Sequence, residues 1–148
     1  MQLPIAAALA LLVAASASAE DLSTATPIAG SWSYAPVADG SEAVFANASG
    51  VPQLWVHCTR VTRRVAISRP ASAAAPVLNI WTSSLTRGAA SSFNPATGRL
   101  TIELANYDPL LDALVSSRGR IGFTIGTQPP LVVPPWPEPA RVIEDCRV

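Results

Sequence analysis

The sequence predicts a mainly β domain: an antiparallel β-sandwich or barrel of about eight short strands with two short helices. Apolar and polar residues alternate with a period of two in several segments, as in strands that bury one face. Glycine, proline and asparagine separate these segments at short intervals, where turns require them. Two further segments carry helix-capping signals instead of alternation.

The alternation is clearest in the segment LWVHCT at 54–59. Leu54, Val56 and Cys58 fall on one face of the predicted strand, and Trp55 and His57 fall on the other. Four more segments repeat the pattern and three show it more weakly. The clear ones are 64–68, 77–83, 99–105 and 120–126, and the weaker ones are 31–35, 42–46 and 131–133.

The first predicted helix follows Asn106. Asp108 is suited to the N-cap and Pro109 to the first helical position, and we expect Gly119 to lie just past the end. A shorter helix is predicted within 135–146. Its residues Val142, Ile143 and Cys146 share one face at three- and four-residue spacing.

Residues 1–19 have the pattern of a cleaved secretory signal peptide. An apolar run over 5–15 leads into small residues at 17–19, and the first acidic residues follow directly. The run is too short to span a bilayer. We therefore expect residues 20–148 to form a single exported β domain, periplasmic or secreted, with no membrane anchor after cleavage.

Two cysteines, Cys58 and Cys146, are present in the chain. In an oxidising compartment an even number of cysteines predicts a disulfide, and here only one intramolecular pairing exists. The alternatives are metal ligation, for which the further Cys or His ligands of a zinc site are missing, and a reactive thiol. The predicted bond would staple the end of the chain to the strand that bears Cys58.

The charged residues exclude several classes of function. Ten arginines balance ten acidic residues, there is no lysine, and His57 is the single histidine. A neutral domain has no broad field to attract nucleic acid. Lysine-dependent phosphate loops and Schiff bases are excluded, and no cofactor or metal site is predicted. His57 is interpreted as a sheet-surface residue, so no catalytic residue is assigned. A catalytic pair of carboxylates that comes together only in the folded protein is left as an alternative.

Aromatic and arginine side chains are the remaining candidates for partner binding. Trp55 and Trp81 both fall opposite the aliphatic face of their strands, where they would form a stacking surface or lie under a second layer. Arg118 and Arg120 bracket Gly119, which suits a fork that holds a carboxylate or phosphate. The alternative is that these arginines end the helix and pair with nearby acids.

The order of features resembles that of small exported proteins of Gram-negative bacteria. A Trp-containing first strand precedes ADGSEAVF at 38–45, then L-x-V-x-C at 54–58, with a last cysteine near the C-terminus. This layout is similar to the type VI secretion accessory family VasI/TagO. The segments at 108–120 and 134–147 look instead like a separate, uncharacterised periplasmic family. Either resemblance implies a β-sandwich binding or accessory protein with no catalytic residues.

Three functions follow as hypotheses. The first is a non-enzymatic periplasmic or secreted domain that binds an envelope protein or glycan. The second is a small carboxylate-dependent hydrolase acting on peptidoglycan or another glycan. The third is a hydrolase inhibitor.

Overall fold

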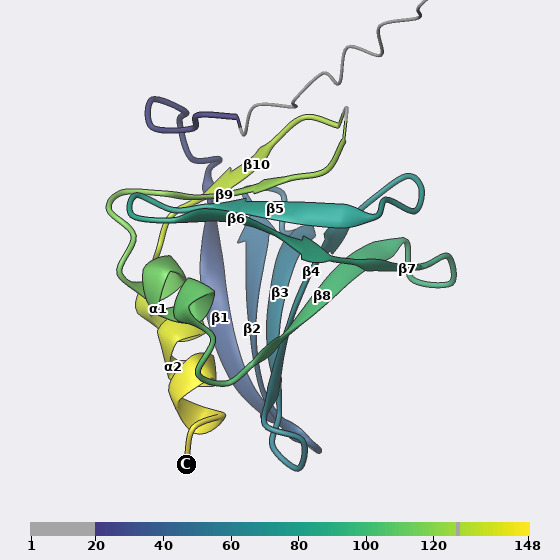
Figure 1. The fold of residues 1–148 in the computed structure, drawn as a ribbon, viewed down its shortest axis with the longest axis vertical. Helices are drawn as coiled ribbons and strands as arrows, with labels where there is room; N and C mark the ends of the chain where they lie inside the picture. The colour runs from purple at the N-terminus through teal and green to yellow at the C-terminus, as the bar shows by residue number, and fades with distance from the viewer. Residues whose placement is uncertain (1–19, 127) are drawn as a thin grey trace, which may run out of the picture.

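The computed structural model describes residues 20–126 and 128–148. The predicted signal peptide at 1–19 lies outside the described residues. The described chain is mainly β, with strands in two antiparallel sheets and two short helices (Figure 1). The sheets form a sandwich, which confirms the predicted fold class.

The larger sheet has six strands in the order β1-β2-β3-β4-β8-β7. Every neighbouring pair is antiparallel, and β1 to β4 follow one another as hairpins. An irregularity between Phe45 and Ala46 interrupts the pairing of the second strand with the third. The strands are β1 (Gly30–Val37), β2 (Gly40–Asn47), β3 (Pro52–Thr59), β4 (Arg64–Pro70), β7 (Ser92–Asn94) and β8 (Arg99–Ala105).

The smaller sheet has four strands in the order β10-β9-β5-β6, all antiparallel. In Figure 1 its strands run across those of the larger sheet at a steep angle. Two short strands, β6 and β7, lie outside the segments that the alternation predicts. The strands of this sheet are β5 (Val77–Trp81), β6 (Thr86–Ala90), β9 (Ile121–Thr124) and β10 (Leu131–Val133).

The core lies between the two sheets and is formed by the alternating residues that the sequence assigns to the apolar face. Trp32 packs edge-to-face against Phe45, with ring centroids 5.6 Å apart. The fully buried side chains of the strands include Leu54, Val56, Val65, Ile67, Leu78, Ile80, Leu100 and Phe123.

One polar side chain, Arg69, also points into the sandwich and is 8% exposed. Its Nη1 donates hydrogen bonds to the carbonyls of Phe123, at 2.6 Å, and Pro129. Burial lowers the pKa of the guanidinium. Arg69 therefore links β4 of the larger sheet to β9 of the smaller one through backbone acceptors.

Helix α1 (Pro109–Val115) begins as the sequence predicts. The Asp108 side chain caps it by accepting from the Leu110 N–H at 2.8 Å. Burial alone would raise the pKa of Asp108, but hydrogen bonds from Arg87 and Leu110 bring it below its ordinary value. The expected end was wrong: Ser116 is the C-cap, and Gly119 lies in the turn beyond, with φ of 75°.

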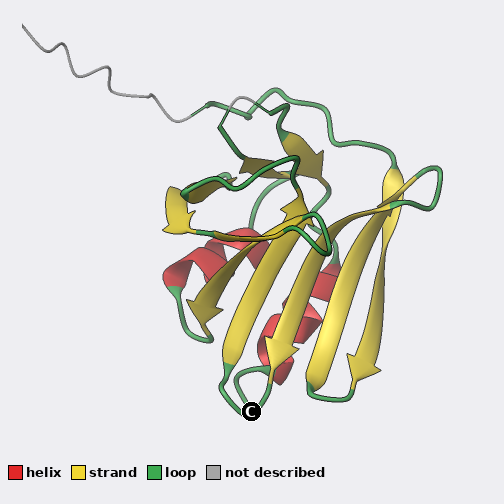
Figure 2. Ribbon diagram, turned by 90° about the vertical axis from the view of Figure 1, so that its right-hand side faces the viewer, coloured by secondary structure: helices red, strands yellow, loops and turns green. Residues whose placement is uncertain are grey.

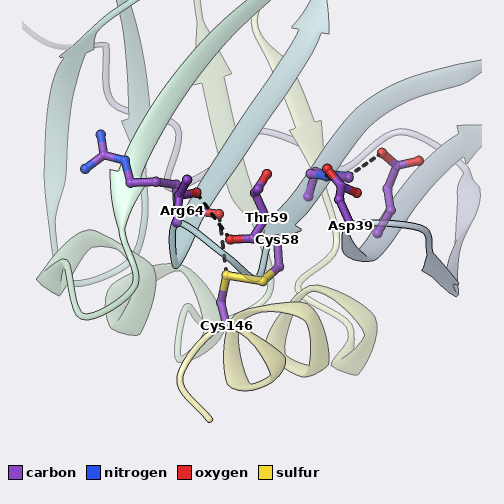
Figure 3. Close-up of polar contacts among 8 residues, drawn as sticks. Asp39, Cys58, Thr59, Arg64 and Cys146 are labelled. Carbon is purple, nitrogen blue, oxygen red and sulfur yellow. Dashed lines mark hydrogen bonds and ion pairs between the residues drawn. A yellow bond between two sulfur atoms is a disulfide. The ribbon is translucent and has the colours of Figure 1, made fainter.

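Helix α2 (Pro137–Asp145) packs on the inner face of β1, β2 and β3. Its apolar face is the predicted one, with Val142, Ile143 and Cys146 fully buried. The Cys58–Cys146 disulfide joins it to β3 with a Cα–Cα distance of 5.6 Å, which confirms the predicted pairing (Figure 3).

Hydrogen bonds hold α2 at both ends. The Trp32 indole donates to the Pro134 carbonyl at 2.8 Å, and the Asn106 amide donates to the Cys146 carbonyl at 3.0 Å. The Tyr34 hydroxyl donates to Asp145 at 2.6 Å. This bond lowers the pKa of the Asp145 carboxyl.

Removing the disulfide should lower the free energy of unfolding by roughly 2 to 5 kcal/mol, because the bond restricts the unfolded chain over a separation of 88 residues. The change is Cys58→Ser with Cys146→Ser, measured by urea unfolding, with wild-type protein in reductant as the matched comparison. Peptide mass spectrometry of unreduced protein should recover the linked pair. Two free thiols, or an unchanged midpoint after reduction, would contradict the assignment.

Tyr34→Phe should destabilise the fold by about 1 kcal/mol near pH 6 and by less in acid. A lowered folded pKa of Asp145 means that its contribution is complete above an unfolded value of about 3.9 and is lost as the pH falls through the folded value. Urea unfolding near pH 6 and at more acidic pH checks this. Tyr107→Phe, at an exposed ring, is the control. A penalty for Tyr34→Phe that does not shrink in acid would refute it.

Candidate functional site

The outer face of the six-stranded sheet is uncovered within the described residues. Both helices lie behind the sheet when this face is viewed in Figure 2. Its outward side chains are half-buried or exposed, whereas their inward neighbours are buried. Two cross-strand rows define what we call the open face: Val44, Trp55, Ser68 and Thr101 in one, and Glu42, His57, Ala66 and Glu103 in the next.

Trp55 is the large aromatic side chain at the centre of the open face. The Arg99 guanidinium, from β8, lies 3.5 Å from the centroid of its ring. Such stacking of a guanidinium on indole is favourable. Arg99 makes no side-chain hydrogen bond or ion pair with any residue in 20–126 or 128–148. Its donors therefore remain available.

His57 lies between two carboxylates at the next row of the open face. Its Nδ1 is 3.1 Å from Glu42, its cross-strand partner, and its Nε2 is 3.1 Å from Asp39 on the β1–β2 turn. An imidazole can donate to both carboxylates only when both of its nitrogens carry protons. No local sequence pattern indicates this triplet, because strand register and the β1–β2 turn bring its members together.

The triplet is a hydrogen-bonded group in which His57 links the β1–β2 turn to β2. Both carboxylates occupy His57 nitrogens that a nucleophile would need, and the imidazole fills the space between Asp39 and Glu42. The two carboxylates contact different nitrogens of the ring. Among the described residues, no group of three or more His, Cys, Asp or Glu side chains is arranged to hold a metal ion.

The second predicted tryptophan, Trp81, lies on the other sheet. The inner residues Leu78 and Ile80 face the core from β5, so Trp81 faces outward on the opposite side of the sandwich from Trp55. Leu22 packs there against Gly122: an added Cβ at this glycine would lie 2.1 Å from Leu22 Cδ1 and 3.4 Å from Trp81 Cβ. The structure therefore does not bring the two tryptophans together, and the N-terminal segment lies beside Trp81.

The two predicted arginines also have separate environments. Arg120 donates from Nη1 to the Ala25 carbonyl at 2.7 Å, which anchors the N-terminal segment. Arg118 is exposed and lines a hollow with Ser83, Ser84 and Ser116. The pair does not form a common fork for an anion.

No family model, curated protein or solved structure matches the chain. The resemblance to the VasI/TagO layout therefore stays a prediction. No helix in the described ranges is long and apolar enough to cross a membrane.

Proposed function

We propose that the chain is an exported, non-enzymatic binding domain that docks an envelope protein on its open face. The observation that carries the proposal is Trp55 with Arg99 stacked on it, at the centre of a sheet face that neither α1 nor α2, the helices of the described residues, covers. Tryptophan and arginine are the side chains most enriched at the energetic centres of protein interfaces.

The shape of the open face favours a protein over a small molecule. Small-molecule sites are concave, whereas this surface is one side of a sheet, with Val44, Ser68, Ala66 and Thr101 around the tryptophan. The other members of the Trp55 row, Val44, Ser68 and Thr101, are smaller than Trp55. Because Arg99 covers the ring at 3.5 Å, a sugar stacking on Trp55 would have to displace it.

Polar side chains surround Trp55 on the open face, as they do at the rim of a protein interface. His57 is held by Glu42 and Asp39 on one side, and Ser68 and Thr101 share a hydroxyl hydrogen bond of 2.7 Å on the other. Rigid polar groups around a central aromatic side chain exclude water from the contact. The disulfide supports export, because such bonds persist in oxidising compartments.

Trp55→Ala should reduce capture of the partner at least tenfold while leaving the fold intact, because it removes the central contact. The assay immobilises wild type and variant and quantifies the proteins retained from a periplasmic extract. Trp136→Ala is the matched control: Trp136 is 43% exposed at the start of α2, away from the open face.

The same variants distinguish the alternatives. If the wild type binds purified peptidoglycan sacculi and Trp55→Ala abolishes that binding, the ligand of the open face is a glycan and not a protein. Release of soluble fragments from sacculi, lost in a folded carboxylate variant, would establish the hydrolase instead. Equal capture by wild type and Trp55→Ala would refute the open face as the binding surface.

A further inference from the structure

A second surface feature lies at the junction of two turns, separate from the open face. The β5–β6 turn and the segment that follows α1 border an open hollow of about 500 Å³. The residues that line it are Ser83, Ser84, Ser116 and Arg118. The lining side chains contribute three hydroxyls and a guanidinium, and none of these residues is acidic.

The two turns are fastened to each other by reciprocal bonds. The Ser83 N–H donates to Ser117 Oγ at 2.9 Å, and the Arg118 N–H donates to Ser83 Oγ at 2.9 Å. Ser117 Oγ in turn donates to the Arg120 carbonyl at 2.6 Å. The walls of the hollow are therefore held in place before any ligand arrives, which reduces the ordering cost of binding.

Several hydrogen-bond donors of the lining have no acceptor among the described residues. Ser83 Oγ accepts from the Arg118 N–H, so its own proton is free to donate. Within the described ranges, neither the Ser84 hydroxyl nor the Arg118 guanidinium makes a hydrogen bond or an ion pair. Ser116 is the exception, because its hydroxyl donates to the Asp112 carbonyl at 2.7 Å.

We propose that this hollow is a binding site for a tetrahedral oxyanion, the phosphate or sulfate group of a small molecule or of an envelope polymer. A guanidinium binds two oxygens of such a group through parallel N–H bonds. The Ser83 and Ser84 hydroxyls supply donors from the facing turn. Donors from two sides suit a tetrahedral group better than a planar carboxylate. The site is independent of partner binding by the open face.

The test is a titration of the oxidised, ¹⁵N-labelled protein with inorganic phosphate, sulfate and acetate, against chloride at equal ionic strength. Phosphate and sulfate should shift the Ser84 and Arg118 amide signals saturably, and acetate should bind more weakly. Arg118→Gln should weaken binding at least tenfold, because it removes the charge and keeps the backbone N–H that bonds to Ser83. Ser84→Ala should weaken it severalfold.

Arg63→Gln is the matched control, since it removes an exposed arginine from the β3–β4 turn and should leave binding unchanged. An equal loss of anion binding in Arg118→Gln and Arg63→Gln would show that the protein attracts anions only through its general charge, and would overturn the site. Shifts that do not saturate, or that chloride reproduces, would also overturn it. If acetate matches phosphate, the tetrahedral preference is wrong. Small phosphate and sulfate esters, compared with phosphorylated and sulfated glycans, then show whether the group comes from a small molecule or from an envelope polymer.

Discussion

The Cys58–Cys146 bond is the constraint on which the placement of α2 against the larger sheet depends. It fixes a nine-residue helix, too short to be stable alone, against the inner face of β3. Trp32 and Asn106 then satisfy the backbone around that helix from β1 and the β8–α1 turn. With α2 on one half of the inner face and the smaller sheet on the other, the apolar residues of β1 to β4 are covered from one side only. Within residues 20–126 and 128–148, no helix lies on the opposite side (Figure 2).

The two faces of each sheet therefore differ in what they contact. The smaller sheet has its inner face in the core, and its outer face carries Leu22 against Gly122, with Arg120 holding Ala25. Arg69 closes the sandwich by joining the sheets through carbonyl acceptors. Stability therefore resides in the core, α2 and the N-terminal segment. The open face carries the Trp55–Arg99 pair and His57 with its two carboxylates, to which the proposed function assigns recognition.

Period-two alternation predicts β3 and β8 because each buries one face, and two cysteines in an oxidising compartment predict their own pairing. The strands β6 and β7 escape prediction because Thr-Arg-Gly-Ala-Ala and Ser-Phe-Asn carry little alternation and rely on pairing with β5 and β8. The same alternation places Trp55 and Trp81 outward, but it cannot tell which sheet each strand joins. Arg99 reaches Trp55, and Asp39 and Glu42 reach His57, only through strand register and turns, so these contacts leave no local sequence signal.

The most direct test of the open face is site-specific photo-crosslinking in Gram-negative cells that express the full chain. A photoreactive residue replaces either Glu103, exposed on the open face, or Glu144, exposed on α2 behind the sheet. The two positions match in residue type and exposure and differ in the face they report. The account predicts a discrete adduct with a protein partner from position 103, lost when Trp55 is also replaced by alanine, and none from position 144. An adduct from position 144 with none from position 103 would contradict it.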